Sequence, residues 1–520
     1  MHNLSPSGAQ VLLETLVRGG VTTCFGNPGT SEVHFVHGLD AVPAMRCVLA
    51  LAETVATGAA DGFARMSGTT AATLLHCGPG LANGLANLHN ARKARTSILN
   101  IVGDQAQFHD YMDPPLASNT EAFAQTVSAW TRRSHSSLAV GADAAAAVAQ
   151  ARFGGGAIAT LILPSDVCWG PGGPAGIPPA APARGVVDEE AIKAVHDLLR
   201  TGKRSAIILG DDALTDRCQR LAHAVGAQSG ASVLAHSFIR RIERGGDRPG
   251  IVRIPYAVTP ARAMFADIDT VVLVGAARPV FAFAGPDGLS EPTAPGTQFM
   301  ALGSPGDDLE TALAMLCDRP DASPCGLDAL PRATRRPEVA TGPITPEAFG
   351  QSLAALLPHD AIVVDEGVSF GRSVFAATQH APRHDWLQLT GGAIGCGMPL
   401  AIGAAIAAPG RRVVTLQADG SGLYSVQALW TQARERLDVT TIVFANKRYE
   451  ILFNETRRMG LTPGASAGRL FSLDDPAMDW VKLANGFGVE AASAASMDEL
   501  NDLLAAALNR PGPFLIELLL

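Results

Sequence analysis

The sequence predicts an α/β protein of three domains, each with a parallel sheet flanked by helices. Its 520 residues are too many for one hydrophobic core. Short runs of β-branched residues alternate with helical patterns, which is typical of parallel strands joined by crossover helices. Two stretches rich in proline interrupt this alternation, so we expect domains at residues 1–170, 188–326 and 345–520.

The composition excludes several classes of function. The net charge of −9 is spread along the chain without a basic block, which argues against a nucleic acid partner. The N-terminus lacks the pattern of a signal peptide, and no apolar run is long enough to cross a bilayer. We therefore expect a cytoplasmic protein with no membrane contact.

The eight cysteines are scattered and form no C-x-x-C pair. This spacing argues against a zinc site or a disulfide framework. The expectation is that all eight are reduced thiols in or near the core.

The first domain is predicted to begin with a helix capped by a serine and to continue as alternating strands and helices. The predicted helices cover 7–18 and 54–66, and the predicted strands cover 21–25, 46–50, 71–75, 98–102 and 160–163. The carboxyl ends of parallel strands meet at one edge of a sheet, where open α/β folds bind their ligands. Polar residues that follow these strands are therefore candidates for a site.

Glu53 and His76 are the two candidates with acid–base chemistry at this edge. Glu53 stands among apolar residues, and burial raises the pKa of a carboxyl group until it can exchange a proton near neutrality. By itself, Glu53 is better explained as an acid at the start of a helix, where it interacts with the helix dipole. His76 follows the strand at 71–75, and a lone histidine is more often a hydrogen-bonded structural residue than a catalytic one.

The last domain is predicted to contain the clearest ligand motif, Asp419-Gly420-Ser421 after the strand at 413–416. The next strand, at 439–445, ends at Asn446, so the acid and the amide would share one sheet edge. Carboxylate, amide and turn carbonyl oxygens are ligands suited to Mg²⁺. Backbone N–H groups at Gly420 and Ser421 can approach a phosphate. The pattern predicts a clamp for a diphosphate.

The remaining predicted elements frame this motif. In the last domain they are helices at 346–357 and 424–436, a strand at 361–364 and a glycine-rich loop around Gly392. In the middle domain they are a helix at 189–200 and strands at 205–210 and 271–275, each ending in glycine. The middle domain is Rossmann-like but has no Gly-x-Gly-x-x-Gly fingerprint, so a structural role is favoured over nucleotide binding.

Together, these motifs resemble the thiamine-diphosphate enzymes of the acetolactate synthase and benzoylformate decarboxylase group. Asp419 and Asn446 are similar to the family's Gly-Asp-Gly…Asn-Asn signature, with Ala418 and Ala445 standing where its first Gly and first Asn are usual. The resemblance implies that Asp419, Asn446 and the backbone of Arg448 hold Mg²⁺. It also assigns pyrimidine binding to the first domain and diphosphate binding to the last.

The resemblance further implies roles for the first domain. Glu53, followed by an Ala-Asp-Gly-Phe-Ala-Arg run at 60–65, would protonate the pyrimidine ring of the cofactor. His76 and Thr30 match residues that act on the substrate in benzoylformate decarboxylases. A second catalytic histidine of those enzymes matches Ala284 here, which puts a two-histidine mechanism in doubt.

The resemblance also implies a larger set of residues that contact the cofactor. Among them, Ile394 would be the bulky residue that bends the cofactor into its reactive V shape. The set is Asn27, Pro28, Gly29, Gly78, Pro79, Gly80, Asn83, Gly392, Ala393, Ile394, Gly420, Ser421, Tyr449 and Ile451. In the family, the two halves of the site come from different subunits, which implies a homodimer or homotetramer.

The sequence thus predicts an enzyme that uses thiamine diphosphate and Mg²⁺ on a small-molecule 2-oxo acid. It would decarboxylate the substrate and then either release an aldehyde or pass the resulting carbanion to a second carbonyl. Acetolactate synthase activity is the alternative, and a non-catalytic, cofactor-binding partner subunit is an alternative of another class. FAD in the middle domain stays open without being favoured, and an NAD-type dehydrogenase is disfavoured by the missing glycine fingerprint.

Overall fold

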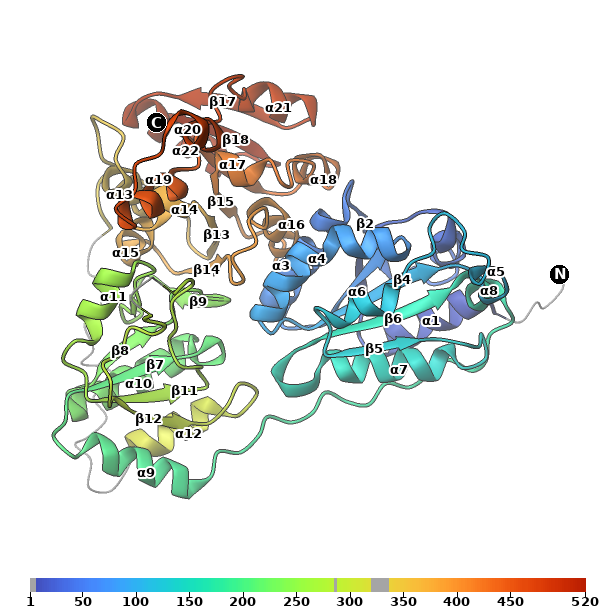
Figure 1. Ribbon diagram of the computed structural model, residues 1–520, viewed down its shortest axis with the longest axis horizontal. Helices are drawn as coiled ribbons and strands as arrows, with labels where there is room; N and C mark the ends of the chain where they lie inside the picture. The colour runs from blue at the N-terminus through green and yellow to red at the C-terminus, as the bar shows by residue number, and fades with distance from the viewer. Residues whose placement is uncertain (1–5, 285–287, 319–335) are drawn as a thin grey trace.

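The computed structural model of the protein describes residues 6–284, 288–318 and 336–520. Three sheets follow one another along the described chain (Figure 1). The first lies at the right of Figure 1, the second at the lower left and the third at the upper left. The end of the predicted middle domain, near residue 326, lies outside the described residues.

The first sheet has six parallel strands in the order β2-β1-β3-β4-β6-β5. Its strands are β1 (Thr23–Asn27), β2 (Arg46–Leu49), β3 (Ala71–Leu75), β4 (Ile98–Asp104), β5 (Trp130–Arg133) and β6 (Ile158–Pro164). Its helices are α1 (Gly8–Arg18), α2 (Val33–Gly38), α3 (Glu53–Ser67), α4 (Cys77–Lys93), α5 (Gln107–Asp110), α6 (Thr120–Gln125), α7 (Val140–Ala151) and α8 (Ser165–Trp169). Ser7 caps α1 in a capping box with Gln10, as the serine at this position predicted.

The middle sheet has five parallel strands in the order β10-β8-β7-β11-β12. They are β7 (Ser205–Leu209), β8 (Ser232–Ala235), β10 (Val252–Arg253), β11 (Thr270–Val274) and β12 (Gln298–Leu302). Its helices are α9 (Glu189–Leu199), α10 (Asp216–Ser229), α11 (Val258–Phe265) and α12 (Leu309–Cys317). A long extended connection joins α8 to α9 along the underside of α7 (Figure 1).

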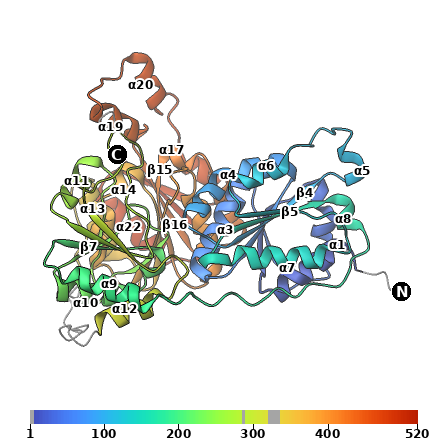
Figure 2. The ribbon, with the colours of Figure 1, turned by 60° about the horizontal axis from the view of Figure 1, so that its bottom comes forward.

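The third sheet has seven strands in the order β17-β18-β16-β15-β13-β14-β9. They are β9 (Arg241–Arg244), β13 (Ala361–Glu366), β14 (His384–Gln388), β15 (Val413–Ala418), β16 (Val439–Ala445), β17 (Glu490–Ala494) and β18 (Phe514–Leu519). Its helices are α13 (Pro346–Leu356), α14 (Val368–Gly371), α15 (Val374–Ala377), α16 (Gly397–Ala407), α17 (Asp419–Gly422), α18 (Ala428–Arg434), α19 (Glu450–Arg458), α20 (Ala465–Phe471), α21 (Trp480–Gly486) and α22 (Met497–Leu508). Of these, α19 and α20 project from the body of the molecule (Figure 2).

One strand of the third sheet comes from the middle of the chain. β9 pairs antiparallel with β14, at the edge of the sheet. Arg241 of β9 donates to Asp385 of β14 at 2.8 Å, and the Arg244 guanidinium lies 3.5 Å from the centroid of the Phe375 ring. This strand therefore fastens the region predicted as the middle domain to the last sheet.

The first and third regions pack together through α3 and α16. A Cβ on Gly62 would overlap the carbonyl oxygen of Leu400, and one on Gly403 would overlap that of Ala59. Glycine is therefore required at both positions for the helices to approach this closely. The contact fixes the loop before α16 against the first region.

Two expectations from the sequence are wrong. The helix predicted at 424–436 is shorter, because the chain forms i→i+3 turns from Ser421 to Tyr424 and from Gly422 to Ser425 before α18 begins. The cysteines are not all reduced thiols, because Cys317 is disulfide-bonded. Within the described residues, every helix is too short or too polar to span a bilayer.

Candidate active site

Glu53 is held at the carboxyl edge of the first sheet by two amide side chains. It opens α3, and only 7% of the residue is exposed. Asn27 Nδ2 donates to its Oε1, and Asn83 Nδ2 donates to its Oε2, each at 3.2 Å. Since the two oxygens of a carboxylate can accept about four hydrogen bonds, Glu53 keeps capacity for a further partner.

His76 is positioned by a buried glutamate that the sequence analysis missed. His76 is the N-cap residue of α4, and its Nδ1 lies 2.8 Å from Glu32 Oε2. Glu32 is 2% exposed and also accepts from the Gly29 backbone N–H at 2.8 Å. A carboxylate at Nδ1 favours the tautomer with hydrogen on that nitrogen, which leaves Nε2 as an acceptor.

The contact between Glu32 and His76 cannot be predicted from local sequence patterns, because the two residues are far apart in the sequence. Glu32 and His76 are separated by 44 positions. The signal that could have found Glu32 is its spacing from Gly29, which is that of a capping box. Thr30, predicted to act on the substrate together with His76, begins the 3₁₀ helix η1 (Thr30–Glu32) and is exposed. The hydroxyl beside His76 belongs instead to Ser31, whose Oγ lies 3.0 Å from His76 Nδ1.

Glycines before η1 and in the first turn of α4 make room for their neighbours at this edge. A Cβ on Gly29 would overlap the His76 ring, and one on Gly78 would overlap Ser118 Oγ. A Cβ on Gly80 would lie 3.3 Å from Glu53 Oε1. Their neighbours Pro28 and Pro79 are exposed.

Cys77 adds a thiol to this edge. It is buried and has a φ of +53°, a backbone conformation unusual outside glycine. Burial raises the pKa of its thiol to about 11. Cys77 is therefore a thiol rather than a thiolate at neutral pH.

Asp419 opens α17 at the carboxyl edge of the third sheet and is held by backbone groups. Its Oδ1 accepts from the Gly420 N–H at 2.7 Å, and its Oδ2 accepts from the Lys447 N–H at 2.6 Å. The residue is 3% exposed, and burial raises the pKa of its carboxyl group. Within the described residues, none of its hydrogen-bond or ion-pair partners is a cationic side chain.

Asn446 lies beside this acid because β15 and β16 are parallel neighbours. Asn446 Oδ1 accepts from the Arg448 N–H at 3.1 Å, and the Arg448 carbonyl accepts from the Glu450 N–H at 3.1 Å. Lys447, between them, has a φ of +56°. The loop thus brings an amide oxygen and a backbone carbonyl near a buried carboxylate.

The other cofactor contacts predicted in this region are Gly420, Ser421, Tyr449 and Ile451. A Cβ on Gly420 would lie 2.6 Å from Tyr449 Cε1, so the ring covers the glycine. Ser421 Oγ donates to the Ala418 carbonyl at 3.1 Å and accepts from Gln417 Nε2 at 2.6 Å, so its hydroxyl is already bonded within the protein. Ile451 is half-buried on α19.

The loop at 391–397 is anchored from both sides. Asn90 of α4 donates to the Ala393 carbonyl at 2.7 Å and accepts from its N–H at 3.2 Å. Gly392 has a φ of +80°, which explains the glycine, and Ile394 is half-buried. Asn90 and Ala393 are 303 positions apart, so this contact ties the loop of the third region to α4 of the first.

Glu366, at the end of β13, is the second positioning residue that the sequence analysis missed. It is 2% exposed and accepts from the N–H groups of Gly395 at 2.6 Å and Gly397 at 2.7 Å. It also accepts from Gln417 Nε2 at 3.0 Å, and burial raises the pKa of its carboxyl group. Glu366 therefore connects the loop that carries Ile394 to the strand that leads to Asp419.

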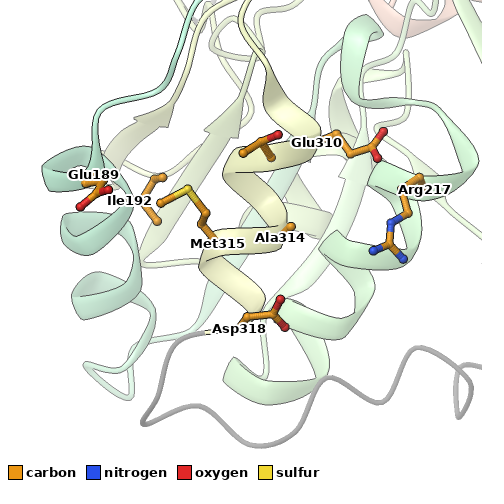
Figure 3. Close-up of a pocket in the computed structure, with 8 residues that line it drawn as sticks. Glu189, Ile192, Arg217, Glu310, Ala314, Met315 and Asp318 are labelled. Atoms are coloured by element: carbon orange, nitrogen blue, oxygen red, sulfur yellow. The ribbon is translucent and has the colours of Figure 1, made fainter.

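The two groups remain separate within the chain. In the described ranges, no hydrogen bond joins Glu53 or His76 to Asp419 or Asn446. A hollow of about 520 Å³ lies elsewhere, lined by residues of α9, α10 and α12 (Figure 3). In that hollow, Ile192 of α9 and Met315 of α12 approach each other, and none of the predicted site residues contributes to it.

Comparisons with known proteins agree with the motifs. Two family models for thiamine pyrophosphate enzymes match, the N-terminal TPP binding domain over residues 6–123 and the C-terminal TPP binding domain over residues 369–518. A Mycobacterium tuberculosis protein, provisionally named acetolactate synthase large subunit IlvX, is 46% identical, with 98% of each chain covered. The benzoylformate decarboxylase of Pseudomonas aeruginosa is 29% identical, with 97% of each chain covered.

A solved structure gives the same result for the fold. The thiamine diphosphate-dependent 4-hydroxybenzoylformate decarboxylase of Rhodococcus jostii superposes with a TM-score of 0.82 over 98% of each chain. At 23% identity, this likeness shows the fold alone. The α/β architecture predicted from the sequence is confirmed.

Proposed function

The chain belongs to the thiamine pyrophosphate enzyme family, and we propose that it decarboxylates a 2-oxo acid with thiamine diphosphate and Mg²⁺. After CO₂ is lost, the rest of the substrate is released as an aldehyde or is joined to the carbonyl carbon of a second molecule. When bound, thiamine diphosphate would act as the electron sink for negative charge on the former carbonyl carbon of the substrate. The protein supplies the binding, the orientation and the proton transfers.

The observation that carries the metal assignment is the buried Asp419 carboxylate, which within the described residues has no cationic side chain among its hydrogen-bond or ion-pair partners. A buried carboxylate is stabilised by pairing with a cation or a metal ion. Asn446 and the Arg448 carbonyl provide further oxygen ligands on the adjacent loop, which suits Mg²⁺ and not a softer ion. These three residues would hold the metal, with Gly420 and Ser421 beside the diphosphate.

Glu53 supplies the proton exchange in this proposal. Its carboxyl group is buried but has room for one more hydrogen bond, as a partner of a ring nitrogen requires. Asn27 and Asn83 hold it in place, and Gly80 leaves space beside its Oε1. Glu53 would give a proton to the pyrimidine nitrogen and take it back.

The remaining predicted residues would line the same site. Those of the cofactor are Asn27, Pro28, Gly29, Gly78, Pro79, Gly80, Asn83, Gly392, Ala393, Ile394, Tyr449 and Ile451. His76, with Nε2 directed away from Glu32, would act on the substrate as a hydrogen-bond acceptor or base, and Thr30 would lie beside it. Ala284 offers no second imidazole, so His76 would act without a histidine partner.

Acetolactate synthase activity is the second candidate, because the relative with 46% identity carries that name. The two activities differ in product, since one releases an aldehyde and the other joins two 2-oxo acids. They also differ in the expected cofactor, because bound flavin in the middle domain would favour acetolactate synthase activity. A purified protein without a yellow chromophore would favour decarboxylation.

We place the complete site between two subunits. No hydrogen bond or ion pair joins Glu53 to Asp419 within the described residues, and each opens a helix at the carboxyl edge of its own sheet. A second copy would bring the missing half to each group, which requires at least a homodimer. A homotetramer made of two such dimers fits as well.

The function is tested by a screen of 2-oxo acids with the purified holoenzyme, combined with mass spectrometry of the native protein. We expect bound thiamine diphosphate and CO₂ release from at least one aromatic or aliphatic 2-oxo acid, with an aldehyde as product. Bound cofactor without turnover of any 2-oxo acid would indicate a non-catalytic partner subunit.

A further inference from the structure

We propose a second metal site, for a borderline-soft divalent cation such as Zn²⁺, formed by Glu32, His76 and Cys77. One ligand atom from each residue lies within 4.8 Å of the other two. The set contains a carboxylate oxygen, an imidazole nitrogen and a sulfur. It lies beside the first sheet, in η1 and at the start of α4, and is separate from the oxygen ligands around Asp419.

The three ligand atoms face a common point, which the Ser31 hydroxyl occupies. Ser31 Oγ lies 2.5 Å from Glu32 Oε1, 3.0 Å from His76 Nδ1 and 3.2 Å from Cys77 Sγ. An ion would take the place of this hydroxyl after Ser31 turns away. The fold therefore provides the convergence of ligands before any ion arrives.

The chemistry of the set selects the ion. Nitrogen, oxygen and sulfur ligands together suit Zn²⁺, whereas Mg²⁺ and Ca²⁺ bind oxygen. Ligands of a tetrahedral zinc ion lie roughly 3.3–3.8 Å apart, given bonds of about 2.0–2.3 Å. Here Glu32 Oε2 and His76 Nδ1 lie 2.8 Å apart, and His76 Nδ1 and Cys77 Sγ lie 3.9 Å apart, so small movements complete the geometry.

Packing holds two of the ligands in place. Gly29 lies against the His76 ring, where a Cβ would overlap it, and its N–H holds Glu32 at 2.8 Å. Cys77 is buried with little freedom to move. Binding the ion would release the thiol proton to solvent, because coordination to a metal deprotonates a thiol. Three protein ligands leave the fourth position for water.

Binding would also inhibit turnover, a consequence that rests on the function proposed for His76. The ion would replace the Glu32 hydrogen bond at Nδ1 and change the tautomer and direction of the ring. His76 could then no longer present a neutral Nε2 acceptor to the substrate. Inhibition by Zn²⁺ would be reversible, and a zinc-selective chelator in excess Mg²⁺ would restore activity.

The site is tested without turnover by titrating Co²⁺ into the holoenzyme, kept saturated with thiamine diphosphate and Mg²⁺. Wild type should bind one ion per chain and show a sulfur-to-cobalt charge-transfer band in the near ultraviolet. Cys77→Ser should lose that band. Cys168→Ser is the matched control, because Cys168 is also buried and is close enough to Glu32 for its pKa to respond to that carboxylate, and it should keep the band. A band that survives Cys77→Ser, or no binding at all, would overturn the site.

Ser31→Ala gives the opposite test. Removing the hydroxyl from the point of convergence should tighten Zn²⁺ binding about tenfold, because the ion no longer displaces a bonded group. Weaker or unchanged binding would contradict the placement of the ion. Binding with an intact band but no inhibition would leave the metal site standing and remove the role proposed for His76.

Discussion

The two loop groups at the sheet edges are held together in different ways. In the first region, the acids are held largely by side chains: Asn27 and Asn83 hold Glu53, and Ser31 and His76 contact Glu32. In the third region, Asp419 is held by two backbone N–H groups.

The difference predicts how each region responds to substitution. A contact made by a side chain is lost when that side chain is removed, whereas a backbone N–H survives most substitutions of the residue that carries it. The metal group should therefore tolerate changes around Asp419 but not of Asp419 itself. The proton-transfer group should be sensitive to its neighbours as well.

The largest effect is expected for Asp419→Ala. The metal would lose its only charged protein ligand while it faces a diphosphate, so thiamine diphosphate should no longer stay bound. Cofactor per chain, measured after gel filtration in buffer with Mg²⁺, should fall to background. Asp502→Ala, an exposed change on α22, is the control and should retain the cofactor. Full occupancy and activity in Asp419→Ala would remove the clamp assignment.

Glu53→Gln should affect turnover more than binding. The amide keeps the shape and a hydrogen bond but cannot exchange the proton, so turnover should fall on the order of 10²–10⁴-fold. Exchange of the thiamine-diphosphate C2 proton, followed by NMR in deuterated buffer, should slow to a similar degree. Exchange at the wild-type rate would mean that Glu53 serves only as the first residue of α3.

Asn83→Ala tests whether the side-chain support of Glu53 matters. Its loss removes one hydrogen bond to a carboxylate, and such bonds contribute about 1.5–3 kcal/mol. Because Asn83 is exposed, we expect the low end, a fall of about tenfold in kcat/KM. An unchanged kcat/KM would show that Asn27 alone positions the acid.

The smallest effect is expected for Lys447→Ala, although Lys447 contacts Asp419 directly. The contact uses the backbone N–H, which alanine keeps. The left-handed backbone conformation, with a φ of +56°, costs alanine as much conformational energy as lysine because both have a Cβ. Stability should change by less than about 0.5 kcal/mol, as for most exposed positions. Cofactor affinity should change less than about twofold. A large loss of affinity would mean that the lysine side chain takes part in diphosphate binding.

The sequence was sufficient for elements whose pattern is local. β3 and β16 were predicted with the bounds they have, and α1 was predicted from its serine cap, because buried strands and caps have local signals. Asp419 and Asn446 were identified because each directly follows such a strand. Their shared edge then follows from parallel pairing.

What the sequence missed depends on contacts between distant segments. Glu32 meets His76 across 44 positions, and Glu366 meets Gly397 across 31. β9 joins a sheet far along the chain, which no periodicity reveals. The helix predicted at 424–436 was too long because an apolar pattern does not show where turns replace a helix.

The central claim, that the groups around Glu53 and Asp419 are two halves of one site, is tested most directly by mixing subunits. Glu53→Gln and Asp419→Ala chains are each expected to be inactive. After unfolding and refolding together, about half of the dimers should be mixed, and each of these should have one intact site. Activity should recover to about a quarter of the wild-type value in the mixture. No recovery, with mixed dimers demonstrated by native mass spectrometry, would contradict a site shared between subunits.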